Sequence, residues 1–181
     1  MESRSKILGH PMHPMLITLP LGLFVTSVIF DILFLITGND LFPVVSFYAI
    51  MTGVIGGLLA AIFGFIDWFA VPAGTRAKRV GLLHATGNIV LLILFSFSWL
   101  IRRSEPGLEP PVLSLVASFL AIAIGMGTAW LGGEMVYRLG VGVDPGANLE
   151  APNSLSDQPA SPSSRMTSVP VTGSEKEIDE P

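Results

Sequence analysis

The 181-residue sequence contains no cysteine. This absence excludes disulfide bonds, thiolate zinc sites, cysteine-ligated iron–sulfur clusters and a cysteine nucleophile. Any metal ion would therefore need histidine, carboxylate or methionine ligands. Histidine is scarce as well, because the chain has only three: His10, His13 and His84.

Charge is also scarce, since only 13% of the residues are charged and 50% are hydrophobic. A soluble domain has about 25% charged residues. The basic residues form no stripe of the kind that binds nucleic acid, and the sequence lacks the Walker, H-E-x-x-H, G-x-S-x-G and G-x-G-x-x-G motifs. We therefore expect no nucleic-acid partner, while the question of enzymatic activity stays open.

What the chain has instead is four long apolar runs, each close to the roughly 20 residues that a helix needs to cross a bilayer. We predict spans over residues 15–37, 43–71, 80–101 and 111–137, with a bend at Pro20 in the first. Short connections make successive helices antiparallel. The predicted fold is all-α: a polytopic membrane protein whose residues 15–143 form an antiparallel four-helix transmembrane bundle in contact with lipid.

The two ends of the chain differ from this bundle. Residues 1–14 form an N-terminal segment that contains the stretch His-Pro-Met-His-Pro. The apolar run after it exceeds the 7–15 residues, roughly, of a signal peptide and no cleavage motif follows, so we expect an uncleaved first span. Residues 144–181 are rich in proline, serine and acidic residues and lack aromatics, which predicts a disordered tail.

Basic residues near the membrane predict the orientation. Four spans place both termini and the loop 72–79 on one side, together with Arg4, Lys6, Arg76, Lys78, Arg79 and Arg138. The opposite side has only Arg102 and Arg103. The positive-inside rule therefore places both termini in the cytoplasm.

Small residues recur every four positions in two of the spans. Gly53, Gly57 and Ala61 follow this spacing in the second span, as do Ala121 and Gly125 in the fourth. Such faces let helix backbones approach closely in lipid. The spacing favours tight packing within one bundle, with homo-oligomerisation as the alternative.

Five ionisable residues lie near the cytoplasmic ends of the predicted spans: His10, His13, Asp67, His84 and Glu134. Such groups are costly in a membrane, at about 2.5–3.5 kcal/mol for charged residues mid-bilayer, and are functional candidates. A β-turn at Pro11 would bring the first two histidines together. With His84 and either carboxylate they would form a nitrogen–oxygen ligand set suited to zinc, iron or manganese.

Two alternatives remain open for this cluster. A single haem b with His84 and either His10 or, preferably, His13 as axial ligands is one of them. In the other, the polar residues only fix helix packing, and the protein is a non-catalytic accessory or anchor subunit.

Asp31 lies near the opposite membrane face. It is expected either to bond the backbone or an arginine, Arg102 or Arg103, or to carry protons in a proton-coupled transporter. Because four helices leave little room for a hydrated path, the transporter would require oligomerisation.

Three stretches resemble a known family: GHPMHPMLITLPLGLFVTSVIFDIL, FGFIDWFAVPAGTRAKRVGLLHATGN and WLGGEMVYRLGVGV. They are similar to the bacterial predicted membrane proteins grouped as domain of unknown function 2231, over about residues 8–143. The resemblance implies a four-helix inner-membrane domain without an established activity, and its motif positions fall on His10, His13, Asp31, Asp67, His84 and Glu134. Some relatives are joined to Rieske-type iron–sulfur modules, which implies redox chemistry with a membrane partner protein. The leading hypothesis is therefore metal-ion or haem binding at the cytoplasmic-side cluster, in support of redox or membrane-enzyme chemistry.

Overall fold

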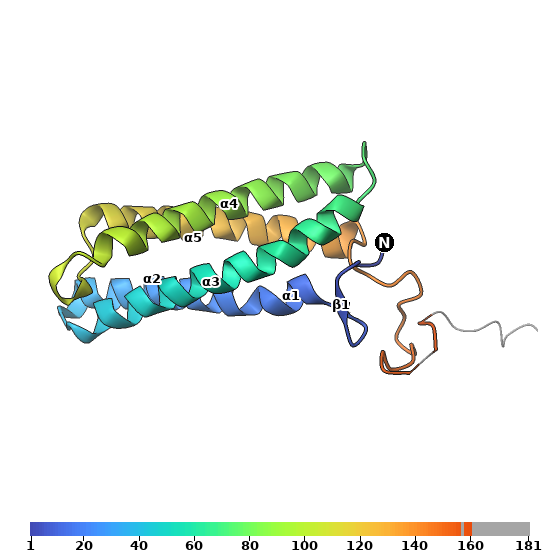
Figure 1. Ribbon diagram of the computed structural model, residues 1–181, viewed down its shortest axis with the longest axis horizontal. Helices are drawn as coiled ribbons and strands as arrows, with labels where there is room; N and C mark the ends of the chain where they lie inside the picture. Colours follow the sequence, from blue (N-terminus) through green and yellow to red (C-terminus); the bar gives the residue numbers. More distant parts are fainter. Residues whose placement is uncertain (157, 161–181) are drawn as a thin grey trace, which may run out of the picture.

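Four long apolar helices pack antiparallel in the computed structural model, which describes residues 1–156 and 158–160 (Figure 1). This arrangement confirms the predicted all-α membrane fold. The predicted disorder of the tail falls largely on residues 157 and 161–181, which lie outside the described residues. The elements in chain order are β1 (Lys6–Ile7), β2 (His10–Pro11), α1 (Met12–Leu16), α2 (Thr18–Thr37), α3 (Leu41–Ala70), α4 (Arg76–Arg102), η1 (Pro106–Leu108), α5 (Val112–Gly133) and η2 (Glu134–Arg138).

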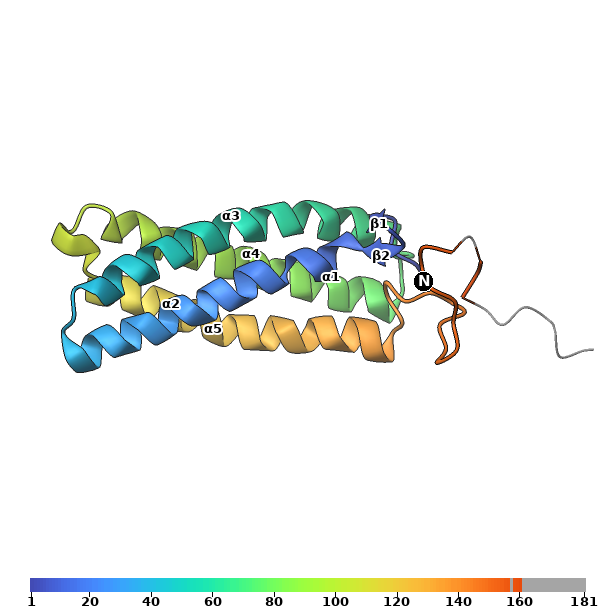
Figure 2. The same cartoon turned by 90° about the horizontal axis from the view of Figure 1, so that it is seen from below.

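The first span begins at Met12, three residues earlier than predicted, and is broken into α1 and α2 at Ile17. Proline at position 20 has no N–H to donate to the carbonyl of Leu16, so the regular hydrogen-bond ladder is interrupted one turn before the proline. Pro14 lies inside α1. Figure 2 shows α1 at the end of the bundle that carries β1, β2 and the N-terminus.

The other helix ends follow local capping chemistry. Gly38 adopts a left-handed conformation with φ of 66° and ends α2. The Thr75 hydroxyl accepts a hydrogen bond from the Lys78 N–H, so α4 begins at Arg76, before the predicted residue 80. After α5, the single π-helical turn η2 leads to Gly140 and Gly142, both with positive φ.

The core lies midway along the bundle. The rings of Phe24 and Phe95 stack with centroids 4.1 Å apart and an interplanar angle of 6°. A Cβ added at Gly53 would stand 2.7 Å from a ring carbon of Phe24, and one at Gly125 would stand 2.9 Å from Leu91. The stacked ring of Phe24 requires glycine at position 53, and a methyl group of Leu91 lies close over Gly125, which confirms the predicted close packing within the bundle.

The outer surface of the helices is apolar. Side chains such as Leu19, Leu58 and Ile93 are 54%, 56% and 61% exposed. Apolar exposure along the full length of four membrane-spanning helices is the surface expected of a protein whose solvent is lipid, so the bundle contacts the bilayer.

Candidate functional site

The structure brings two of the five predicted ligands together. His13 of α1 and His84 of α4 face each other with ring centroids 6.3 Å apart and an interplanar angle of 84°. Both side chains are half-buried. The helix α1 and the beginning of α4, which carry the two histidines, lie toward the end of the bundle where the N-terminus and the segment after η2 meet (Figure 1).

Each imidazole is oriented by a backbone carbonyl of a neighbouring helix. His13 Nδ1 lies 2.8 Å from the carbonyl oxygen of Ala60 in α3, and His84 Nδ1 lies 2.8 Å from that of Thr128 in α5. Because a carbonyl only accepts hydrogen bonds, each Nδ1 carries a proton, and in the neutral imidazole Nε2 then has the lone pair. A backbone carbonyl orients metal-binding histidines in the same way.

Each ring also packs on a glycine one turn beyond its carbonyl partner. A Cβ added at Gly64 would stand 2.8 Å from His13 Nδ1, and one at Gly132 would stand 3.2 Å from His84 Cε1. These two glycines are part of the site, and neither was identified in it from the sequence. Each glycine lies four residues after the residue whose carbonyl binds the imidazole, Gly64 after Ala60 and Gly132 after Thr128. This equal spacing is the feature of the sequence that could have indicated them.

Asn88 connects His84 to α5. Its side-chain nitrogen donates to the His84 carbonyl at 2.8 Å and lies 3.2 Å from His84 Nε2, while its oxygen accepts from the Thr128 hydroxyl at 3.2 Å. The amide keeps two of these three contacts if Nε2 binds another group. Asn88 therefore holds the imidazole without requiring its lone pair.

Asp67 is not beside the histidines but one turn beyond Gly64, where it holds the N-terminal segment. Its carboxylate accepts hydrogen bonds from the hydroxyl of Ser3 at 2.8 Å and from the backbone N–H groups of Arg4 and Ser5 at 2.8 and 3.2 Å. Oδ1 accepts three of these bonds and Oδ2 shares the one from Ser3, so the carboxylate is directed toward the N-terminal segment. Asp67 is therefore a cap for the N-terminal backbone.

Glu134 and His10 are engaged elsewhere too. Glu134 forms an ion pair of 2.6 Å with Arg76, and His10 is exposed in β2, with Nε2 3.3 Å from the hydroxyl of Ser154. The predicted turn that would gather His10 with His13 does not form, because β2 ends at Pro11 and His13 already belongs to α1. Within residues 1–156 and 158–160, no three His, Asp or Glu side chains are grouped so as to hold a metal ion.

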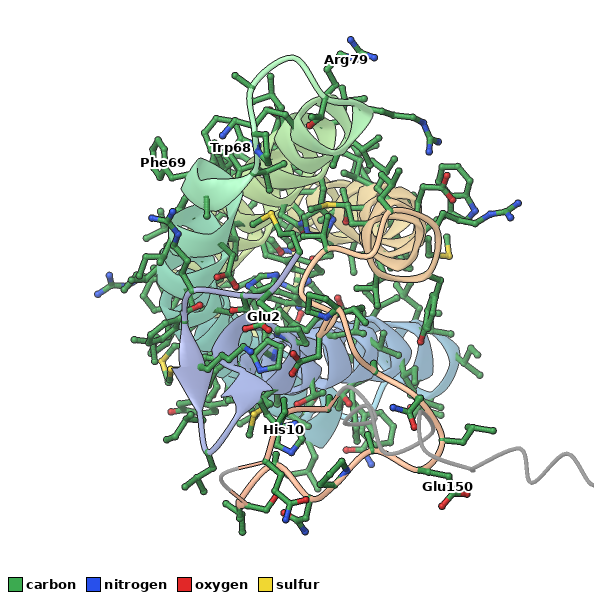
Figure 3. The ribbon with its side chains drawn as sticks, turned by 90° about the vertical axis from the view of Figure 1, so that its right-hand side faces the viewer. Glu2, His10, Trp68, Phe69, Arg79 and Glu150 are labelled. Atoms are coloured by element: carbon green, nitrogen blue, oxygen red, sulfur yellow. The ribbon has the colours of Figure 1, made fainter. Side chains whose placement is uncertain are left out.

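The N-terminal segment is tied to the end of the bundle by charges. Lys6 pairs with Glu2 at 2.9 Å and lies 3.8 Å from Asp144, and the amino group of Met1 donates to the carbonyl of Gly140 at 2.8 Å. The hydrogen bond from Lys6 lowers the pKa of Glu2, whereas a hydrogen bond shared with Glu2 raises the pKa of Asp144. Figure 3 shows Glu2 and His10 on this segment, in front of the helix ends.

Asp31 forms a second polar site at the opposite end of the bundle. Its two carboxylate oxygens accept hydrogen bonds of 2.6 and 2.7 Å from the two terminal nitrogens of Arg102, and both side chains are 0% exposed. The expectation that Asp31 bonds Arg102 is confirmed.

Serine hydroxyls complete the surroundings of Arg102. Ser46 accepts from Nη1 at 3.0 Å, Ser118 from Nη2 at 3.3 Å and Ser98 from Nε at 3.2 Å. A guanidinium has five N–H donors, and with the two oxygens of Asp31 all five have acceptors. The cluster joins α2, α3, α4 and α5.

The pattern of one protein family, described as "Predicted membrane protein (DUF2231)", matches residues 9–145. The chain belongs to this family. The matched residues include both histidines of the pair, Asp31 and all four helices of this DUF2231 protein. No curated protein and no solved structure matches the chain.

Proposed function

We propose that this membrane protein holds one redox-active metal centre between His13 and His84, and that the centre is a haem b. The observation that carries the proposal is the orientation of the two rings: each Nδ1 is fixed by a backbone carbonyl at 2.8 Å, which directs the Nε2 lone pairs away from those carbonyls. The lone pair of His84 Nε2 would bind a metal in place of the Asn88 amide, which lies 3.2 Å away. Haem iron held by two histidines exchanges single electrons.

The number of protein ligands favours haem over a bare ion. Asp67 and Glu134 have other partners, so the site offers two neutral nitrogens and no carboxylate. A zinc, iron or manganese ion would have too few protein ligands and no negative charge to balance its own. A porphyrin supplies four nitrogens and two negative charges itself, so two imidazoles suffice.

The spacing of the rings agrees with this choice. Two imidazoles on opposite sides of one metal, each through a bond of about 2.0–2.1 Å, have centroids roughly 6 Å apart. The centroids of His13 and His84 are 6.3 Å apart. A bare ion between the same two rings is the second candidate, because the same distance supports it.

The test is an absorption spectrum and an elemental analysis of the full-length protein purified in detergent. We expect a Soret band and one iron per chain. His13→Ala and His84→Ala should each remove most of the band, because each deletes one axial nitrogen. His10→Ala is the matched control, since that exposed histidine is bonded to Ser154 and should leave the spectrum unchanged.

Other results would decide between the alternatives. Stoichiometric zinc, iron or manganese without a Soret band would favour the bare ion. A protein that has neither, and in which His13→Ala lowers only stability or partner binding, would be an accessory or anchor subunit.

Proton-coupled transport through Asp31 has no support from its contacts, because its carboxylate is held on both oxygens by Arg102.

The proposed setting is the bacterial inner membrane, with both termini in the cytoplasm. At the end that carries the histidine pair, Arg4, Arg79 and Arg138 are exposed. At the other end, the charge of Arg102 is balanced by Asp31, which leaves Arg103. This distribution supports the positive-inside orientation, and electron exchange at the cytoplasmic side would need a redox partner protein or a second copy of the chain.

A further inference from the structure

The sequence of the second hairpin of helices repeats that of the first. Residues 43–49 read PVVSFYA and residues 111–117 read PVLSLVA, which share proline, valine, serine and alanine at the same four positions. Residues 24–27 read FVTS and residues 95–98 read FSFS. Self-similarity of this kind is the signature of an internal repeat.

The match continues in constant register along both helix pairs. In α3 and α5, the equivalent positions after the alanine include Gly57 with Gly125 and Gly64 with Gly132. In α1–α2 and α4, the same register that equates Phe24 with Phe95 equates His13 with His84 and Asp31 with Arg102. Two of these three pairs are identical, and the third has opposite charges.

Equivalent residues meet each other across the middle of the bundle. Phe24 stacks on Phe95, Asp31 is bonded to Arg102, and His13 faces His84. Contacts between a residue and its own counterpart arise where two copies of one unit are related by a two-fold axis. The three contacts lie at three depths, so the axis runs along the bundle.

The residues around the two histidines correspond to each other by the same two-fold relation. The carbonyl that holds His13 is that of Ala60, and the one that holds His84 is that of Thr128, its counterpart. The glycine under each ring is likewise equivalent, Gly64 for His13 and Gly132 for His84. The ligand, its orienting carbonyl and its glycine are thus all present twice.

We infer that α1–α3 and α4–α5 are two copies of one helix hairpin, related by a two-fold axis along the bundle, and that the cofactor lies on this axis with His13 and His84 as equivalent ligands. The second part rests on the proposed function, whereas the first does not. A planar iron porphyrin with two open axial positions has the symmetry that such a site requires. If the two rings kept their interplanar angle of 84°, they would bind the iron in nearly perpendicular planes.

The repeat is tested by exchanging Asp31 and Arg102 in the full-length chain. A guanidinium at position 31 would have Ser27 one turn before it as an acceptor, just as Arg102 has Ser98. Ser114 would take the role that Ser46 has for Arg102. Only the counterpart of Ser118 is missing, because Ile50 stands there. We expect Asp31→Arg combined with Arg102→Asp to recover most of the thermal stability that each single exchange loses.

A serine pair makes this test specific for symmetry. In the parent, Ser98 accepts from Arg102 and also bonds the carbonyl of Ser114 and the hydroxyl of Ser118, whereas Ser27 donates to the carbonyl of Phe24. Ser98→Ala should therefore lower the unfolding temperature more than Ser27→Ala in the parent. This difference should become smaller in the exchanged variant, because Ser27 would then accept from the arginine while Ser98 would keep its bonds to Ser114 and Ser118. An exchanged variant that is no more stable than the single ones, or an unchanged difference between the two serine variants, would overturn the repeat.

The cofactor part is tested by spectroscopy on the parent chain. We expect His13→Ala and His84→Ala to lose the Soret band to the same extent, and the parent to give the strongly anisotropic low-spin EPR signal of perpendicular axial imidazoles. A band that survives either substitution would overturn equivalent ligation. A smaller serine difference without a Soret band would support the repeat and refute the proposed haem. A Soret band without that smaller difference would support the haem and refute the repeat.

Discussion

At the scale of single residues, the ion pair of Arg102 and Asp31 is the contact that depends most on every one of its partners. Both side chains are fully buried, and every N–H of the guanidinium has an acceptor. Removing one partner of such a pair leaves an uncompensated charge, whereas removing both leaves none. The cluster is therefore stable only as a complete set.

This property predicts the behaviour of two variants. Asp31→Ala should lower the free energy of unfolding by about 3–5 kcal/mol, because Arg102 stays buried without its anion. The double variant Asp31→Leu with Arg102→Met should recover most of that loss, because it leaves only serines that can bond to their own helices. Denaturant unfolding in detergent measures both, and equal loss in the single and double variants would contradict the argument.

The glycines at the histidine pair give a second prediction for single residues. Gly64→Ala places a methyl group 2.8 Å from His13 Nδ1, so we expect a loss of about 1–3 kcal/mol from overpacking and a loss of bound cofactor. Gly127→Ala is the matched control, since its Cβ would meet nothing within 4 Å and alanine favours a helix by roughly 0.5–1 kcal/mol. Unfolding and the Soret absorbance together measure the difference, and identical results for the two variants would contradict it.

At the scale of elements, the sequence predicts the helices well and the site only in part. Long apolar runs bounded by proline, glycine and arginine indicate four spans regardless of how side chains pack. The level of a residue along a helix does not say which partner it bonds, so Asp67 and Glu134 were placed beside the histidines. Their partners, the N–H of Arg4 and the side chain of Arg76, come from segments whose paths only the fold defines.

The N-terminal segment is an element that depends on one side chain. Asp67→Ala removes the acceptor for the N–H groups of Arg4 and Ser5, so we expect faster amide hydrogen exchange at these residues and an unchanged rate in the middle of α3. Glu134→Gln is the control, because it weakens only the Arg76 pair at the same end of the bundle. Exchange rates at residues 3–5 that do not change in Asp67→Ala would show that the segment is held by other contacts.

At the scale of the whole molecule, the buried ion pair sharpens the charge asymmetry between the two membrane faces. Arg102 is fully buried among four helices, so it is not a base of the loop on its face, which leaves Arg103 there. The exposed bases Arg4, Arg79 and Arg138 are all at the other face. The face that holds the N-terminus and the loop between α3 and α4 should therefore be cytoplasmic.

The absence of cysteine makes this orientation directly measurable, because the parent chain cannot react with thiol reagents. Ala73→Cys and Ser104→Cys each add one thiol in an exposed loop, on opposite faces. In bacterial spheroplasts, a membrane-impermeant maleimide should label Ser104→Cys directly and Ala73→Cys only after permeabilisation. The reverse pattern would place both termini outside the cytoplasm, and with them the histidine pair, so its redox partner would then have to be sought on the other side of the membrane.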